Sequence, residues 1–224
     1  MTIKTKWLIL LSLFLVTVGL KAEPKRMLLL CDPVQQAIVQ EAIKELKADV
    51  QVTVPKNLRA YNSTVVLEDL DKALGDQPWD IIYFNFGIAD LVHRDPNTRD
   101  VRLMNKDAGG QPTSLDLYEK NVDQIVQKLK LTKAKLLWGS TTPMVTVHFF
   151  ASFQGGLFNA NSELEYNQKA EALMKRHQVE IIDLHAHVMN NFQKEDKHPP
   201  YIAYSKAMKD KGKPFSELFA NHLK

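Results

Sequence analysis

Residues 27–46, MLLLCDPVQQAIVQEAIKEL, hold one complete strand-and-helix unit of the fold. The apolar run at 27–31 is typical of a strand that is buried on both faces, as in a parallel sheet. Pro33 then opens a segment in which apolar residues recur at helical spacing, and Asp32 is the residue type that caps a helix start. The sequence therefore predicts a β-strand that turns directly into an amphipathic helix.

The same alternation of strand and helix continues along the chain. Further strands are predicted at 49–54, 79–86, 135–139 and 179–184. Further helices are predicted at 67–74, 115–131, 162–178 and 214–223. Strands that are separated by helices and lack hairpin signals favour parallel pairing through right-handed crossovers. We therefore expect an α/β fold, a three-layer α/β/α sandwich around a five-stranded parallel sheet.

Residues 1–22 have the pattern of a secretion signal peptide. Two lysines precede an apolar run at 7–20, and Ala22 offers a small residue for cleavage. The run has about 14 residues, whereas a helix needs roughly 20 to cross a bilayer. An uncleaved N-terminal anchor is the alternative. We expect an exported protein, periplasmic or extracellular, in which residues 23–224 form one domain without stable membrane insertion after cleavage.

The charge balance and the cysteine count exclude several classes of function. The chain has 29 Lys and Arg residues against 26 Asp and Glu residues, a formal net charge of +3. Three of the lysines lie in residues 1–22, so the remainder is balanced at 26 against 26. A neutral chain gives no electrostatic case for a nucleic-acid partner. The single cysteine, Cys31, excludes an internal disulfide and any zinc site of paired cysteines.

Five short motifs, taken in order, resemble those of the SGNH (GDSL-type) hydrolase superfamily and of an exported, esterase-like branch of it. The motifs are residues 79–91, Tyr118 with Asn121, residues 137–143, Tyr166 and Asn167 with Ala170, and Asp183 with Leu184. Their spacing and order agree over about residues 26–192. The resemblance implies a flavodoxin-like topology, ester hydrolysis on acylated saccharides or small esters, and no cofactor.

The resemblance also implies a catalytic serine directly after the first strand, and here this sequence departs from the family. The tripeptide that matches the family's Gly-Asp-Ser is Cys31-Asp32-Pro33, and proline has no hydroxyl. Deleting the nucleophile of such a catalytic set costs on the order of 10⁶ in rate. The inherited acyl-transfer chemistry is therefore expected to be near background.

The other catalytic features that the resemblance implies are changed or displaced as well. The region around Asn62, which matches the second conserved block of the family, lacks the glycine whose amide would face an oxyanion. The third block, within residues 79–91, keeps Gly87 and Asp90 but has Ala89 where a polar side chain would reach into the site. Ala207 occupies the position expected for the catalytic histidine near the C-terminus. Losing one oxyanion donor alone costs roughly 10²–10³ in rate.

Three residues are candidates for a relocated catalytic role, each with a plainer alternative. Cys31 is a thiol nucleophile if the turn is shifted by one residue, or else a buried strand residue. Asp32 is a carboxylate nucleophile or a ligand-binding acid, or else an ordinary N-cap. His198 is a relocated base with Glu195 and Asp196 close enough to orient it, or else part of a solvated charged loop.

Ligands of open α/β sheets bind at the carboxyl ends of the strands. Two long irregular segments, 91–114 and 143–161, follow strand ends at this edge. The second contains four phenylalanines within residues 148–158, which either stack on a ligand or pack onto neighbouring helices. The predicted ligand-binding residues are Asn62, Gly87, Asp90 and Thr142.

No metal site is predicted. His185 and His187 are two residues apart, but on a helix over 185–192 they would splay, so surface histidines are expected. We therefore predict a catalytically degenerate SGNH-type protein that binds a saccharide or a protein partner at the former ester-hydrolase cleft. An active esterase or deacylase with relocated catalytic residues is the alternative. A nucleotide binder is disfavoured because no Gly-rich turn follows the first strand, and the oligomeric state stays open.

Overall fold

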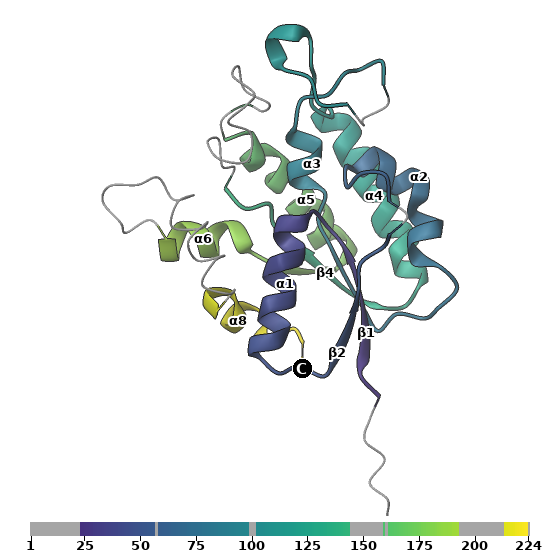
Figure 1. Cartoon of the computed structure of the whole chain (residues 1–224), viewed down its shortest axis with the longest axis vertical. Coiled ribbons are helices and arrows are strands. Elements are labelled where there is room, and N and C mark those ends of the chain that lie inside the picture. Colours follow the sequence, from purple (N-terminus) through teal and green to yellow (C-terminus); the bar gives the residue numbers. More distant parts are fainter. Residues whose placement is uncertain are drawn as a thin grey trace, which may run out of the picture.

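Five parallel strands form one sheet in the order β2-β1-β3-β4-β5. The computed structural model describes residues 23–56, 58–98, 102–143, 159, 161–192 and 213–223. The strands are β1 (Lys25–Leu30), β2 (Val50–Thr53), β3 (Ile81–Phe84), β4 (Lys135–Gly139) and β5 (Glu180–Ile182). This strand order is that of flavodoxin-like folds. The predicted α/β class and topology are thus confirmed (Figure 1).

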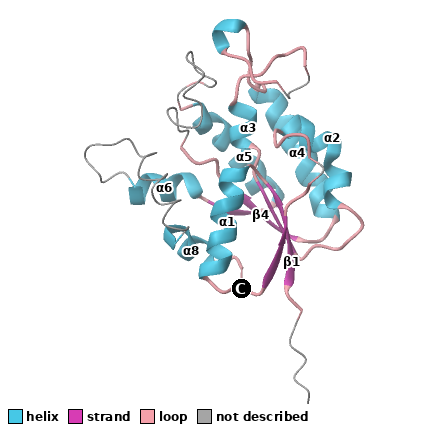
Figure 2. Ribbon diagram, in the orientation of Figure 1, coloured by secondary structure: helices cyan, strands magenta, loops and turns pink. Residues whose placement is uncertain are grey.

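Helices cover both faces of the sheet, so that it is the middle of three layers (Figure 2). The helices are α1 (Pro33–Glu45), α2 (Ser63–Leu74), α3 (Gly87–Leu91), α4 (Leu115–Leu131), α5 (Ser162–His177), α6 (Leu184–Phe192) and α8 (Lys213–Ala220), with one 3₁₀ turn, η1 (Lys106–Ala108). None of the helices in the described ranges is long and apolar enough to cross a membrane.

The side chains of β1 alternate between two hydrophobic cores, because successive residues of a strand point to opposite faces of the sheet. Leu28 and Leu30 pack in the core that α2, α4 and α5 cover. Met27 and Leu29 pack in the core that α1, α6 and α8 cover. All four side chains are fully buried, which explains the uninterrupted apolar run in this part of the sequence.

Helix α2 is longer than the sequence pattern predicted. It begins at Ser63 rather than at residue 67, because the Asn62 side-chain oxygen accepts a hydrogen bond from Val65 N at 2.9 Å. This contact satisfies one of the donors that every helix leaves free in its first turn. Val65 and Val66 are buried before the predicted start, so the apolar spacing at 67–74 marked only the later part of the helix.

Strand β3 is shorter than the predicted strand at 79–86. Trp79 and Phe86 are buried in the core that α2, α4 and α5 cover, but they lie outside the pairing of β3 with β1 and β4. The apolar run therefore predicted the buried residues correctly, but it overestimated the length of the strand that pairs in the sheet. The helix α3, which begins at Gly87 directly after this strand, was not predicted.

The N-terminal segment 1–22, the four phenylalanines of residues 148–158 and His198 all lie outside the described residues. Most of the predicted irregular segment 91–114 is loop, and isolated antiparallel bridges join Arg94 to Leu103 and to Gln111. The predicted secretion signal and the predicted catalytic role of His198 stay predictions.

Candidate functional site at the carboxyl edge of the sheet

Polar side chains follow four of the five strands at the point where each strand ends. Asp32 follows β1, Asn85 follows β3, Ser140 follows β4 and Asp183 follows β5. Since all the strands are parallel, these four residues come from one edge of the sheet. This is the edge at which open α/β sheets bind their ligands.

Asp32 caps helix α1 through only one of its two carboxylate oxygens. Its Oδ1 accepts hydrogen bonds from Val34 N at 2.8 Å and Gln35 N at 3.2 Å. Its Oδ2 is buried and has no hydrogen-bond partner among the described residues. Burial raises the pKa of Asp32 to about 6, although the backbone hydrogen bonds at the helix start oppose that shift. One acceptor at the end of β1 is therefore left over.

The D32N variant is expected to gain stability relative to the wild type as the pH rises from 4 to 8, by about 2 kcal/mol. The raised pKa means that the folded state holds the Asp32 proton more tightly than the unfolded state, so stability falls as that proton is lost near pH 6. Asparagine caps a helix equally well and does not titrate. Urea unfolding of both proteins at the two pH values measures the difference. An unchanged difference would contradict the buried, unpaired carboxylate.

The structure places Pro33 at the first position of α1, where its ring fits the helix start. Cys31, the residue before Asp32, is fully buried in the core on the α1 side. Burial, with a smaller contribution from the Asp32 carboxylate, raises the pKa of the Cys31 thiol well above its usual value. A nucleophilic cysteine must form a thiolate, and this environment opposes one.

Gly87 and Thr142, two of the predicted ligand-binding residues, adjoin a hydrogen-bonded frame at the ends of β3 and β4. Gly87 N donates to Asn85 Oδ1 at 2.9 Å, and Asn85 Nδ2 donates to Thr141 Oγ1 at 3.1 Å. Asn167 on α5 donates to Thr141 O and accepts from Thr141 N, both at 2.8 Å. Thr142, the residue after Thr141, is buried. The Gly87 amide is thus one of the hydrogen-bond donors within this frame.

Asn62 and Asp90, the other two predicted ligand-binding residues, meet at the start of helix α2. Asp90 is fully buried and accepts hydrogen bonds from Ser63 N at 2.7 Å and Ser63 Oγ at 2.8 Å. Burial raises the pKa of Asp90 to about 7, against the lowering effect of hydrogen bonds from Thr113 and Ser63. The structure therefore gives Asn62 a role in capping α2 and Asp90 a role in holding the start of α2 to α3.

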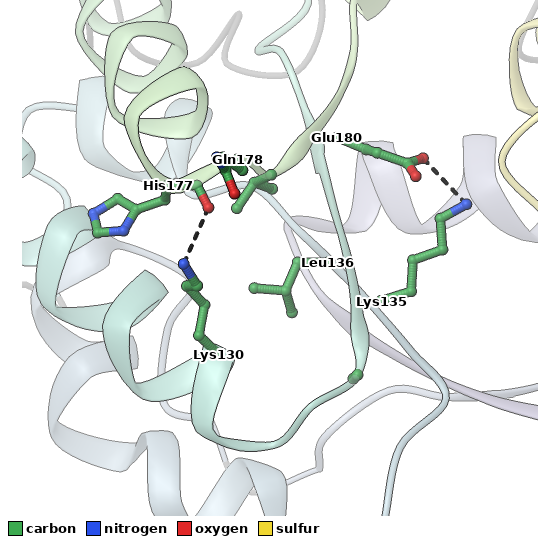
Figure 3. Close-up of a pocket in the computed structure, with 8 residues that line it drawn as sticks. Lys130, Lys135, Leu136, His177, Gln178 and Glu180 are labelled. Carbon is green, nitrogen blue, oxygen red and sulfur yellow. Dashed lines mark hydrogen bonds and ion pairs between the residues drawn. The ribbon is translucent and has the colours of Figure 1, made fainter.

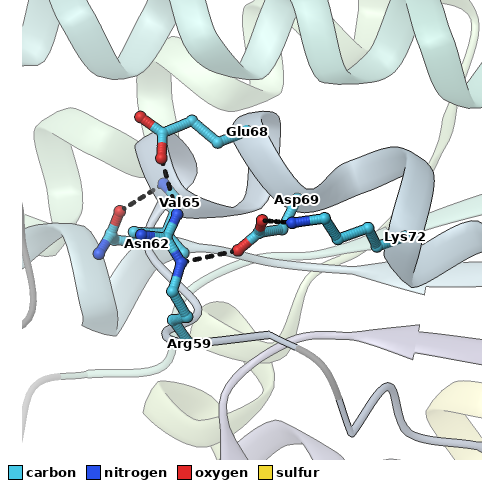
Figure 4. Close-up of polar contacts among 6 residues, drawn as sticks. All are labelled: Arg59, Asn62, Val65, Glu68, Asp69 and Lys72. Carbon is cyan, nitrogen blue, oxygen red and sulfur yellow. Dashed lines mark hydrogen bonds and ion pairs between the residues drawn. The ribbon is translucent and has the colours of Figure 1, made fainter.

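The outer side of α2, next to the Asn62 cap, carries a group of ion pairs (Figure 4). Arg59 lies 2.7 Å from Glu68 and 2.9 Å from Asp69, and Lys72 lies 3.0 Å from Asp69. Asp69 is buried while its partners extend into solvent. These contacts fix the loop before α2 to the helix, and they leave no unpaired charge in this group for a ligand.

Glu163 and His185 form a contact at the same edge that the sequence did not predict. His185 Nε2 lies 3.8 Å from Glu163 Oε1, and the His185 side chain is 18% exposed, so this expected surface histidine is partly buried against α5. His185 N donates to Ser140 Oγ at 2.9 Å, and Ser140 Oγ donates to Asp183 Oδ1 at 3.0 Å. An acidic residue in the first turn of a helix is common enough that the sequence offers no signal for this pairing.

No group of three or more His, Cys, Asp or Glu side chains that could hold a metal occurs within the described ranges. A cavity of about 290 Å³ lies instead at the opposite edge, at the amino ends of β4 and β5 (Figure 3). Lys130 in its wall donates to His177 O at 3.2 Å, and Lys135 pairs with Glu180 at 3.1 Å. Both lysines that line this cavity therefore bond to other residues of the protein. The cavity lies at the edge of the sheet opposite Asp32.

A sequence profile of the GDSL-like lipase/acylhydrolase family matches residues 17–219. The chain belongs to this family. Among curated proteins no sequence match was found. This GDSL-like chain therefore has the family suggested by its five motifs, and the residues of those motifs, such as Asn121 and Asn167, prove to be parts of the frame around the sheet edge.

Solved structures of GDSL-like hydrolases share the fold of this family member. A catalytic mutant of an acetylxylan esterase from Geobacillus stearothermophilus matches with a TM-score of 0.58 and 12% identity, covering 91% of this chain and 95% of that one. A lipase/acylhydrolase from Enterococcus faecalis matches with a TM-score of 0.54 and 13% identity, covering 89% and 97%. An acetyl xylan esterase, AlAXEase, matches with a TM-score of 0.53 and 15% identity, covering 83% and 97%. At these identities the likeness concerns the fold alone.

Proposed function

We propose that this GDSL-like family member is an exported protein that binds a saccharide at the carboxyl edge of its sheet and does not hydrolyse esters by the family's mechanism. The observation that carries the proposal is Pro33 at the first position of α1, where the family's serine would stand. Proline supplies neither the hydroxyl that attacks an ester nor a backbone N–H that stabilises the resulting oxyanion.

The surroundings of Pro33 support the same conclusion. The region around Asn62 lacks the glycine whose amide would face an oxyanion in the family, and the nearby Gly87 amide is bonded to the Asn85 side chain. Ala89 has no side-chain donor at all, and Cys31 is buried in a place that opposes a thiolate. With the nucleophile and the oxyanion donors both affected, the expected loss is at least the 10⁶ or so that removal of a nucleophile alone costs.

A saccharide is favoured as the ligand for two reasons. Two of the structures that share the fold belong to acetyl xylan esterases, enzymes whose names give an acetylated saccharide as the substrate. At the carboxyl edge of this sheet, one buried oxygen each of Asp32 and Glu163 has no hydrogen-bond partner among the described residues. Sugar hydroxyls are neutral donors that can satisfy such oxygens without bringing a second negative charge.

Two assays on the same purified protein test the proposal. Hydrolysis of p-nitrophenyl acetate and release of acetate from acetylated xylo-oligosaccharides are expected to stay within about tenfold of the buffer rate, in line with the loss of the nucleophile. Isothermal titration with xylo-oligosaccharides is expected to show saturable binding. An active acetylxylan esterase run in parallel shows that the substrates are competent.

Turnover well above the buffer rate, abolished by D32N or by His198→Ala, would contradict the proposal and establish the alternative of an esterase with relocated catalytic residues. Saturable binding of a protein, with no binding of saccharides, would contradict it in favour of a protein partner. Fractionation of cells that make the full chain tests export, and material retained in the cytoplasm would overturn that part.

A further inference from the structure

Glu163 is a buried acid whose hydrogen bonding is incomplete. The residue is 3% exposed, and its Oε2 is buried with no hydrogen-bond partner among the described residues. The facing imidazole nitrogen, His185 Nε2, lies 3.8 Å from Oε1, beyond the 2.7–3.2 Å of a protein hydrogen bond. A carboxylate that is removed from water without donors is costly, and neither Oε1 nor Oε2 of Glu163 has a hydrogen-bond donor among the described residues. Oε1, the oxygen that faces His185, is therefore open to a donor from a ligand.

The backbone of His185, whose imidazole faces Glu163, is held in place by a series of hydrogen bonds. The His185 backbone N–H donates to Ser140 Oγ, and that hydroxyl donates to Asp183 Oδ1. Ser140 is also tied to the other side of the edge, because Gln35 Nε2 donates to Ser140 O at 3.0 Å. Glu163 comes from the first turn of α5, and His185 comes from the first turn of α6. The pair is therefore positioned by the ends of β4 and β5, within the candidate site.

The distance between the two side chains suits one neutral hydroxyl. An oxygen can lie about 2.8 Å from both Nε2 and Oε1 when these are 3.8 Å apart, accepting a hydrogen bond from the first and donating one to the second. An anionic ligand would be repelled by the Glu163 carboxylate. The described residues supply too few ligands here for a metal ion.

We propose that Glu163 and His185 form a hydroxyl-binding subsite, in which a sugar or other polyol hydroxyl donates to the Glu163 carboxylate and accepts from the His185 imidazole. This assignment rests on the proposed saccharide-binding function and deepens it by naming the residues that the ligand meets. It places the ligand over the ends of β4 and β5, rather than at the family's nucleophile position on α1.

The test compares Glu163→Gln with Glu165→Gln. Both substitutions remove one carboxylate from the first turn of α5, but Glu165 is exposed whereas Glu163 is buried. Titration with xylo-oligosaccharides is expected to show at least a tenfold weaker affinity for Glu163→Gln, the loss of one hydrogen bond to a charged group. Glu165→Gln is expected to bind as the wild type does. Thermal unfolding of both variants checks that they fold.

A second measurement keeps the inference testable if Glu163→Gln does not fold. The His185 ring resonances of the wild-type protein are expected to shift on addition of the oligosaccharide, in proportion to saturation. Binding by the wild type with unchanged His185 resonances, or with equal affinity in Glu163→Gln, would overturn the subsite and leave the saccharide-binding function standing. A wild-type protein that binds no saccharide would overturn both.

Discussion

Replacing Gly87 by alanine is expected to destabilise the protein by about 3 kcal/mol and to lower Tm by roughly 6–12 °C. A Cβ at this position would lie 1.6 Å from Thr141 Oγ1 and 2.6 Å from Thr141 Cβ, far inside van der Waals contact. Thr141 has little room to move, because Asn167 holds its backbone through two hydrogen bonds. Thermal and urea unfolding of the two proteins measure the loss.

A matched control separates this steric cost from the conformational cost of losing a glycine. Gly109 has a left-handed backbone with a φ of +92° but open space around its Cβ position, so Gly109→Ala is expected to cost only about 1 kcal/mol. Adding Thr141→Gly to Gly87→Ala is expected to recover part of the lost stability. Equal losses for Gly87→Ala and Gly109→Ala would show that the close approach of α3 to Thr141 is not what requires the glycine.

Replacing Asp90 by alanine is expected to cost about 2–5 kcal/mol at pH 5. The substitution leaves two buried donors of Ser63, the backbone N–H and the hydroxyl, without the acceptor that both now share. The Ser63 N–H belongs to the first turn of α2, so this helix loses its attachment to α3. Chemical unfolding monitored by circular dichroism measures the loss.

The same substitution is expected to cost less at pH 8 than at pH 5. The pKa of Asp90 is raised to about 7 in the folded protein, so the stability that its bound proton contributes is present at low pH and is lost as the pH rises through 7. Ser63→Ala is the control, since it removes only the hydroxyl and keeps the backbone N–H donating to Asp90. A loss that is the same at both pH values would argue against a buried Asp90 with a raised pKa.

Much of the fold was predictable from local pattern. The continuous apolar runs marked the strands because a parallel sheet is buried on both faces. Asp32 and Pro33 marked the start of α1 because a cap and a proline suit the first turn of any helix. The bounds of α4 and β4 were predicted correctly, at residues 115–131 and 135–139, because each is a regular element with clear breaks in pattern at its ends.

The candidate site was predictable only in part. Gly87, Asp90 and Asn62 were expected to bind a ligand, and the structure shows them bonded to the fold through backbone and side-chain groups. Glu163 and His185 were not expected to meet, since 22 positions separate them and nothing local links them. Contacts of this kind depend on how β4 and β5 pair and on where α5 begins, which no short-range pattern encodes.

The sequence by itself determined the alternation of strands and helices and the family, because these depend on residue type and local order. It also supplied the proposal that Pro33 stands where the resemblance implies a serine. The tertiary structure alone decided which polar groups at the sheet edge form hydrogen bonds within the fold and which do not. The Gly87 amide forms one, whereas one oxygen each of Asp32 and Glu163 has no donor among the described residues. Hydrogen-bond satisfaction is a property of packed neighbours, so it emerges only once distant segments are brought together.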